Sequence, residues 1–242
     1  MNWAPAFLSN PERFMAFSRW AAPLFGAIAV ALAVVGLWMG FAAPDDYQQG
    51  QTVRIMFIHV PAAWLSMFVY ACLAVASFLS LVFRHVLADA AAQAAAPLGA
   101  AFTFLALVTG ALWGRPMWGA YWVWDARLTS VLVLFLLYIA YIALRASLDD
   151  ETKAARAAAI LALVGAINLP IVKFSVDWWN TLHQGASVFR GDGPTLDPVF
   201  LWPLLIMALA YMAAFGSLWL VRIRGEVWRR RADAAALRAA KG

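Results

Sequence analysis

The chain has few charged residues and almost no cysteine. Of its 242 residues, 64% are hydrophobic and only 13% are charged. A soluble domain of this size carries far more charge, so the composition excludes that class. The single cysteine, Cys72, excludes an internal disulfide and is expected to be a small packing residue. The phosphate-binding sequence Gly-x-x-x-x-Gly-Lys-Ser/Thr is also absent, so any energy from nucleotide hydrolysis must come from a partner protein.

Uncharged apolar runs of membrane-spanning length occur six times along the chain. Each can cross about 30 Å of hydrocarbon as a helix. The runs and their connections use nearly the whole chain, so residues 1–242 are predicted to form a single all-α, polytopic integral membrane domain. The six predicted spans are residues 20–41, 60–83, 95–113, 128–144, 157–172 and 199–221.

The basic residues orient the predicted bundle. With a cytoplasmic N-terminus, thirteen of the 18 Lys and Arg residues fall on the inner side and five on the outer side, as the positive-inside rule requires. Both termini are therefore predicted to be cytoplasmic, with outer loops at residues 42–59, 113–127 and 173–198. The inner cations are placed to meet the lipid bilayer or a cytoplasmic partner, which argues against nucleic acid as the ligand.

Residues 113–129, WGRPMWGAYWVWDARLT, form the most unusual stretch of the chain. Five aromatic rings fall within twelve residues, among two glycines, a proline and three charged residues. An interfacial belt usually places only one or two rings at a helix end, so this density favours a ligand-binding surface over a simple lipid anchor. The five rings are Trp113, Trp118, Tyr121, Trp122 and Trp124.

A helix over residues 117–126 would gather part of this stretch on one face. That face would suit a large, flat, partly apolar molecule with anionic groups at one edge. The residues that would share it are Trp118, Tyr121, Trp122 and Asp125, with Arg115 and Arg127 near its two ends.

Proline and serine positions predict several helix boundaries. Pro61 is expected to begin the second helix, which would leave His59 just outside it. Pro116 is expected to break the chain after the third span, and Pro170 to bend the fifth span. Ser147, before an acidic run, is expected to start the fifth helix.

The chain has three histidines, and two of them are predicted to lie on the outer side with the clustered tryptophans. His59 would lie near the positive end of a helix dipole, which favours the neutral imidazole that binds metals. His183 follows the adjacent Trp178 and Trp179 in the third outer loop. His85 is predicted on the inner side, as a solvated or headgroup-facing residue. Either outer histidine alone would be an ordinary surface residue, but their shared location indicates a common site.

Together, these residue types describe a haem site. Iron accepts a neutral imidazole on each axial face, the porphyrin packs on aromatic rings, and the propionates bind guanidinium groups. His59 and His183 are the predicted axial ligands of the haem iron, and Asp125 is expected to orient Arg127 or an indole N–H. The residues predicted to contact the ring are Trp113, Trp118, Tyr121, Trp122, Trp124, Trp178 and Trp179, and the predicted propionate partners are Arg54, Arg115 and Arg127. No Cys-x-x-Cys-His sequence is present to attach haem covalently.

The stretches WGRPMWGAYWVWDARLT, HVPAAW and WWNTLHQG also carry a resemblance. They resemble the tryptophan-rich WWD motif and the histidine flanks of the haem exporter protein C family of cytochrome c maturation, over nearly the whole chain. The resemblance implies a multi-pass protein of the bacterial inner membrane that holds haem b, as a transferred ligand, between His59 and His183. It also implies delivery of haem to a periplasmic haem chaperone, component E. Further implied partners are the ABC-type transporter components A and B and the small membrane subunit component D.

Two other functions stay open from the residues alone. A transporter subunit could export haem or another small solute, although the spans lack charge in their central portions, which argues against ion coupling. A structural assembly subunit could use the rings to pack on a partner, but it would not need two histidines to converge. The chain has no hydrolytic or redox motif of its own, and whether it promotes covalent haem attachment or only presents haem leaves its status as an enzyme undecided.

Overall fold

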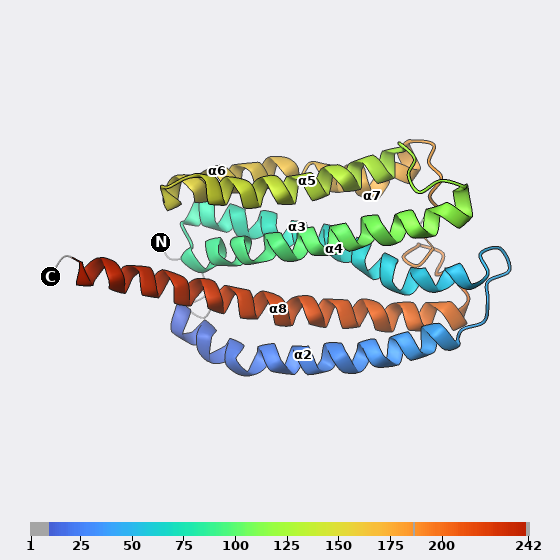
Figure 1. Ribbon diagram of the computed structural model, residues 1–242, viewed down its shortest axis with the longest axis horizontal. Helices are drawn as coiled ribbons and strands as arrows, with labels where there is room; N and C mark the ends of the chain where they lie inside the picture. The colour runs from blue at the N-terminus through green and yellow to red at the C-terminus, as the bar shows by residue number, and fades with distance from the viewer. Residues whose placement is uncertain (1–9, 186, 241–242) are drawn as a thin grey trace.

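The computed structural model describes residues 10–185 and 187–240, which form an elongated helical bundle (Figure 1). Within these residues, six helical stretches are long and apolar enough to cross a membrane, and α6 and α7 together form one of them. The predicted all-α, six-span fold is therefore confirmed. The elements are α2 (Pro11–Ala42), the 3-10 helix η1 (Gln51–Ile55), α3 (Met56–Phe83), α4 (Val86–Trp118), α5 (Ala126–Ser147), α6 (Glu151–Gly165), α7 (Asn168–Trp178) and α8 (Pro198–Ala239).

The helices lie in three tiers (Figure 1). Helices α2 and α8 pack together, α3 packs on α4, and α5 packs on α6 and α7. Contacts of α4 with both α5 and α8 join the tiers. The end of the bundle where α2 begins and α8 finishes is called the inner end here. The opposite end, with residues 43–50, 119–125, 179–185 and 187–197, is called the outer end.

The core lies among α3, α4, α5 and α6 and is built from tyrosines and small residues. Tyr70 and Tyr138 are fully buried and meet edge to face, with ring centroids 5.0 Å apart. The Tyr138 hydroxyl donates a 2.7 Å hydrogen bond to the backbone carbonyl of Ser66, so its polar end is satisfied inside the bundle. At Gly99 a Cβ would lie 2.1 Å from the Tyr138 ring, so only glycine allows this close approach of α4 and α5.

Ion pairs join the helices at the inner end. Arg145 of α5, whose side chain is 6% exposed, pairs with Asp89 of α4 at 2.9 Å. Arg230 of α8 pairs with Asp89 and also with Glu226, one turn earlier on its own helix. Because one carboxylate serves guanidinium groups from two helices, the network fixes α4, α5 and α8 relative to one another.

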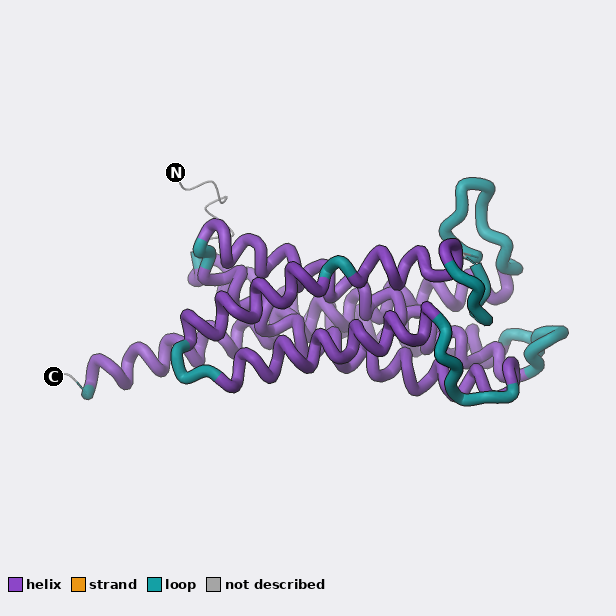
Figure 2. Tube along the Cα trace, turned by 90° about the horizontal axis from the view of Figure 1, so that it is seen from above, coloured by secondary structure: helices purple, strands orange, loops and turns teal. Residues whose placement is uncertain are grey.

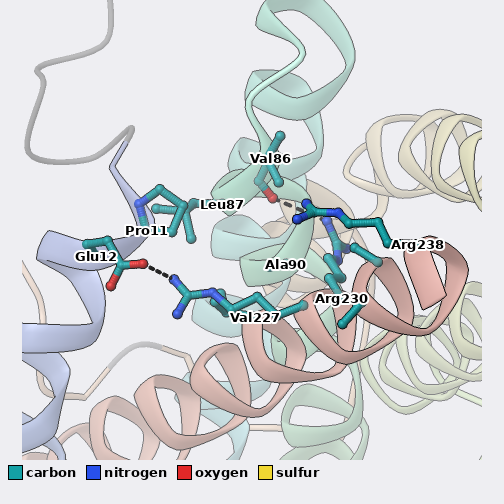
Figure 3. Close-up of a pocket in the computed structure, with 11 residues that line it drawn as sticks. Pro11, Glu12, Val86, Leu87, Ala90, Val227, Arg230 and Arg238 are labelled. Carbon is teal, nitrogen blue, oxygen red and sulfur yellow. Dashed lines mark hydrogen bonds and ion pairs between the residues drawn. The ribbon is translucent and has the colours of Figure 1, made fainter. Parts of the chain in front are cut away.

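A pocket of about 440 Å³ opens beside this network, between the starts of α2 and α4 and the end of α8 (Figure 3). Leu87 and Val227 contribute apolar wall, and Arg230 and Arg238 contribute guanidinium groups. The pocket lies at the inner end, opposite the two outer histidines, and is therefore separate from the site described below.

The start of α3 differs from the prediction. The helix begins at Met56, directly after η1, and Pro61 lies inside it. His59 is therefore in the first turn of α3 and not in the preceding loop, so the predicted boundary is wrong. Pro61 lacks the N–H that would bond the carbonyl one turn earlier, and the helix tolerates the loss of this single bond near its start.

Two further predicted boundaries are also wrong. Pro116 does not break α4, which continues to Trp118. Ser147 is the last residue of α5 and does not start the next helix. That role belongs to Asp150, whose carboxylate accepts the backbone N–H groups of the first turn of α6 at 2.9 and 3.0 Å, since a carboxylate caps a helix start well.

The predicted bend in the fifth span is confirmed. The helix is interrupted at residues 166–167, between α6 and α7, and Figure 2 shows the interruption as a short loop within the bundle. Pro170 explains it, because its ring would clash with the carbonyl of Ala166 and has no N–H to bond to that carbonyl. Asn168 secures the bend by donating a 2.9 Å hydrogen bond to the backbone carbonyl of Ser130 in α5.

Candidate functional site

His59 lies at the outer end and packs against α4. Its Nδ1 is 3.1 Å from the hydroxyl oxygen of Thr109, and its ring meets Trp113 edge to face with centroids 5.7 Å apart. A Cβ at Gly110 would lie 2.9 Å from His59 Cε1. Glycine at this position therefore allows the imidazole to approach the backbone of α4 closely.

His183 lies in the segment of residues 179–185, which follows α7, and packs against the end of α4. Its Nδ1 is 3.3 Å from a carboxylate oxygen of Asp125, and the two side chains are 23% and 9% exposed. The imidazole ring meets Trp118 with centroids 4.9 Å apart. The loop histidine is thus held between the last residue of α4 and the residue that precedes α5.

One face of α4 connects the two histidines. Gly110, Gly114 and Trp118 are spaced four residues apart, which places them on one face of a helix. The Trp118 ring folds back over Gly114, where a Cβ would lie 3.0 Å from it. His59 lies over Gly110, at the start of this face, and His183 contacts the ring of Trp118, the residue at its end. The backbones of Gly110 and Trp118 are about 12 Å apart along the helix axis.

The surroundings of His59 determine which ring nitrogen carries the proton. Thr109 donates its hydroxyl proton to the backbone carbonyl of Leu105 at 2.6 Å, so its oxygen is left as an acceptor. The Nδ1 of His59 must then be the donor in the 3.1 Å contact with Thr109. The neutral ring therefore carries its proton on Nδ1 and a lone pair on Nε2.

Asp125 imposes the same arrangement on His183. A carboxylate can only accept hydrogen bonds, so Nδ1 of His183 donates to Asp125. Burial lowers the pKa of His183, and the hydrogen bond to Asp125 only partly opposes this effect. His183 is therefore neutral at pH 7, with its lone pair on Nε2. In the described part of the chain, neither Nε2 forms a hydrogen bond of ordinary geometry.

Arg127 places a positive charge near both imidazoles. Its guanidinium donates to the hydroxyl of Ser175 at 2.8 Å and to the backbone carbonyl of Lys173 at 3.5 Å. No carboxylate among the described residues forms an ion pair with it. The guanidinium is therefore held in place by neutral groups, and the charges of Asp125 and Asp177 act on it without a close ion pair.

The predicted helix over residues 117–126 is wrong. Gly119 adopts a left-handed conformation, with φ of 75°, and its N–H bonds the carbonyl of Arg115. This is a common way for glycine to end a helix, and the chain then runs without helix to Asp125. There the Asp125 carboxylate caps α5 by accepting the backbone N–H of Leu128 at 2.7 Å. The predicted single face of rings and carboxylate therefore does not form.

The aromatic residues of this stretch occupy two different settings. Trp113 and Trp118 lie on α4 and contact the histidines. Trp122 packs edge to face on Trp124, and its indole N–H is buried without a partner among the described residues. Tyr121 and Trp124 are 58% and 75% exposed. The rings thus form a contact set around the histidines and an exposed set beside it.

Trp178 and Trp179 form a third aromatic group, at the end of α7. Trp178 stacks on Phe174 with centroids 5.4 Å apart, and Trp179 meets Trp178 edge to face. Both tryptophans are at least half exposed. Their ring contacts within the described residues are with each other and Phe174, and not with either histidine.

The other two predicted arginines have local partners. Arg54 pairs with Asp45 at 3.1 Å in the first outer loop. Arg115 lies over the ring of Tyr121, 5.6 Å from its centroid, and donates to the backbone carbonyl of Gly119. Of the three predicted propionate partners, the structure brings Arg127 to the histidines.

His85 differs from the outer histidines in both place and partner. It precedes α4 at the inner end and accepts the backbone N–H of Ala88 at 3.1 Å through Nδ1. It acts as a helix cap, a more specific role than the solvated residue predicted from the sequence.

Sequence reasoning missed several residues that position the site. Thr109 and Gly110 shape the surroundings of His59, and Ser175 holds Arg127. Gln49 accepts the indole N–H of Trp113 at 2.9 Å. Thr109 and Gly110 could have been found from the sequence, because a polar residue beside a glycine is unusual in the outer third of an apolar span. No local pattern marks Gln49 or Ser175.

Comparison with known proteins gives consistent matches over nearly the whole chain. Residues 5–238 match the family model described as Heme exporter protein C. The Heme exporter protein C of Bradyrhizobium diazoefficiens is 62% identical over 93% of this chain and 85% of its own length. The protein of that name from Escherichia coli K12 is 48% identical over 91% of this chain and 89% of its own.

A relative from the liverwort Marchantia polymorpha is 42% identical over 90% of this chain and 92% of its own length. Its name is putative cytochrome c biosynthesis ccmC-like mitochondrial protein. With six membrane-spanning stretches and bacterial relatives matched almost end to end, the chain is a multi-pass protein of the bacterial inner membrane. The chain belongs to the heme exporter protein C family.

Proposed function

We propose that this chain handles haem for cytochrome c biogenesis, and that it binds haem b between His59 and His183 at the outer face of the membrane. One observation carries the proposal. Two imidazoles lie over one face of α4, and each has its Nδ1 engaged by a neighbouring oxygen, Thr109 or Asp125. A neutral imidazole with a free Nε2 is the form that ligates iron. The names of the relatives support haem as the cargo.

The neighbouring groups match the remaining chemistry of haem. Trp113 and Trp118 offer indole rings beside the imidazoles, and aromatic rings pack well against a flat apolar macrocycle. Arg127 offers a guanidinium without an ion-pair partner among the described residues, which suits a propionate. When bound, haem would supply an iron that accepts two nitrogen donors, and the chain would orient those donors and neutralise the acidic edge.

Delivery to a periplasmic chaperone, component E, is the step that we propose for the outer surface. Tyr121, Trp124, Trp178 and Trp179 are exposed at the outer end. Exposed tryptophan and tyrosine are common at binding surfaces, because they bury a large area and keep one polar group. Components A, B and D of the maturation system are the proposed membrane partners, and the absence of a nucleotide loop agrees with energy supplied by a partner.

The ligand assignment is tested with single alanine variants of the purified protein. His59→Ala and His183→Ala should each remove one axial nitrogen, which would change the haem absorption spectrum and lower the haem that co-purifies. His85→Ala, at the inner end, is the matched control and should retain haem like the wild type. Unchanged spectra and haem content in both outer variants would refute the axial pair.

The delivery step is tested separately with the aromatic rings. Trp124→Ala and Trp178→Ala, which remove exposed rings that do not contact either histidine, should impair transfer of haem to the chaperone in membranes where the variants insert at normal levels. The measurement is the amount of chaperone that carries haem after co-expression. Normal loading by both variants would refute a role of these exposed rings in delivery.

A further inference from the structure

The partners of the two imidazoles suggest how the chain prepares its ligands before haem binds. We propose that Thr109 and Asp125 are positioning residues that hold the proton of His59 and His183 on Nδ1, so that both Nε2 atoms face the cargo as lone-pair donors. This inference rests on the proposed function and deepens it. It assigns a role to Thr109, which contacts Nδ1 of His59 and not the nitrogen proposed to bind iron. It also changes the role of Asp125, which the sequence predicted to orient Arg127 or an indole N–H.

The argument at His59 depends on a chain of two hydrogen bonds. The Thr109 hydroxyl lies 2.6 Å from the Leu105 carbonyl and 3.1 Å from His59 Nδ1. Since a hydroxyl has one proton, the bond to the carbonyl leaves only an acceptor for the imidazole. Because His59, Thr109 and Leu105 all lie on helices, this arrangement is held by rigid backbone at both sides.

The argument at His183 depends on the two oxygens of one carboxylate. One oxygen of Asp125 accepts the Leu128 N–H at 2.7 Å and so fixes the side chain to the start of α5. The other accepts Nδ1–H of His183 at 3.3 Å. The capping bond orients Asp125, and Asp125 in turn orients a histidine that lies on a loop. A carboxylate or other acceptor behind a ligating histidine fixes its tautomer and raises its basicity.

The two ligands should therefore differ in strength. His183 donates to a charged acceptor and His59 to a neutral one, and hydrogen bonds to charged groups are roughly twice as strong. His183 is accordingly the more electron-rich donor. Loss of Asp125 should weaken haem binding more than loss of Thr109.

The test compares near-isosteric variants of the full-length protein in detergent. Asp125→Asn keeps an oxygen for the Leu128 N–H but presents an NH₂ group to His183, whose proton must then move to Nε2. Thr109→Val removes the acceptor for His59, and Thr109→Ser restores it. Asp150→Asn, which alters the cap of α6 at the inner end, controls for the loss of a capping carboxylate.

The readouts are haem retained through purification and the spin state of the iron from electron paramagnetic resonance. Asp125→Asn and Thr109→Val should retain haem about 10–100-fold less tightly and show high-spin iron, which added imidazole returns to low spin. Thr109→Ser and Asp150→Asn should match the wild type. These signatures would not accompany a general loss of folding.

The outcomes separate this inference from the proposed function. If the wild type shows two nitrogen ligands, and Asp125→Asn and Thr109→Val keep its spin state and haem content, the positioning roles are refuted while the axial pair stands. If the wild type itself lacks two nitrogen ligands, the axial pair is refuted and the positioning roles fall with it.

Discussion

The substitution Gly110→Ala should displace His59 without harming the fold. The added Cβ would lie 2.9 Å from His59 Cε1, 3.4 Å from Nδ1 and 3.8 Å from Nε2. Carbon atoms in contact settle about 3.5–4.0 Å apart, so the ring must retreat by roughly 0.6–1 Å. A shift of that size lengthens the 3.1 Å contact with Thr109 toward the limit of a hydrogen bond.

This shift should weaken haem binding, because it displaces the nitrogen proposed to bind iron. The clash is at Cε1, the carbon between the two nitrogens, so it moves Nε2 together with the rest of the ring. Disturbing the support of a metal-ligating histidine commonly weakens binding by about 10–100-fold. Alanine favours a helix interior over glycine by about 1 kcal/mol, so α4 itself should not be destabilised.

The assay measures haem retained through purification beside the midpoint of thermal unfolding in the same detergent. Gly110→Ala should lose most of its haem while its unfolding midpoint without haem stays near that of the wild type. Gly225→Ala is the matched control, since a Cβ at that position of α8 meets no atom within 4 Å. If Gly110→Ala retained haem as well as Gly225→Ala, the close approach of His59 to α4 would have no role in the site.

Three further predictions concern the bundle. Asp89→Ala should lower the free energy of unfolding by about 3–5 kcal/mol, because it removes the carboxylate that pairs with the buried guanidinium of Arg145. Asp192→Ala, which removes an exposed ion pair with Arg190, should leave the free energy of unfolding nearly unchanged. Tyr70→Phe should be neutral or stabilising in denaturant titration, because the hydroxyl is buried without a partner among the described residues. Gly165→Ala should lower the free energy of unfolding, because its Cβ would lie 2.1 Å from the Tyr70 hydroxyl oxygen. The double variant with Tyr70→Phe should recover part of this loss. If the two substitutions changed the free energy of unfolding additively, the clash would be refuted.

Most of the fold could be predicted from the sequence, because the length and apolarity of a membrane span are local properties of the chain. An uncharged run of about twenty residues has no stable place except a membrane or a core, so the number of spans followed from the order of residues alone. The residues at which helices begin and end were harder to predict. Pro61 and Pro116 lie inside helices, and Gly119 was the true stop of α4, because a proline costs one hydrogen bond that neighbouring packing can offset.

The order of residues by itself determined the six spans and the density of rings between the third and fourth spans, and it predicted that His59 and His183 lie at the same end of the bundle. Only the tertiary structure decided which groups engage the imidazoles. Thr109 lies 50 residues from His59, and Asp125 lies 58 residues from His183. The hydrophobic effect is non-directional, so the apolar residues that it buries can be predicted from the sequence. A hydrogen bond instead requires two atoms about 3 Å apart at a suitable angle. That requirement is met only after the helices have packed.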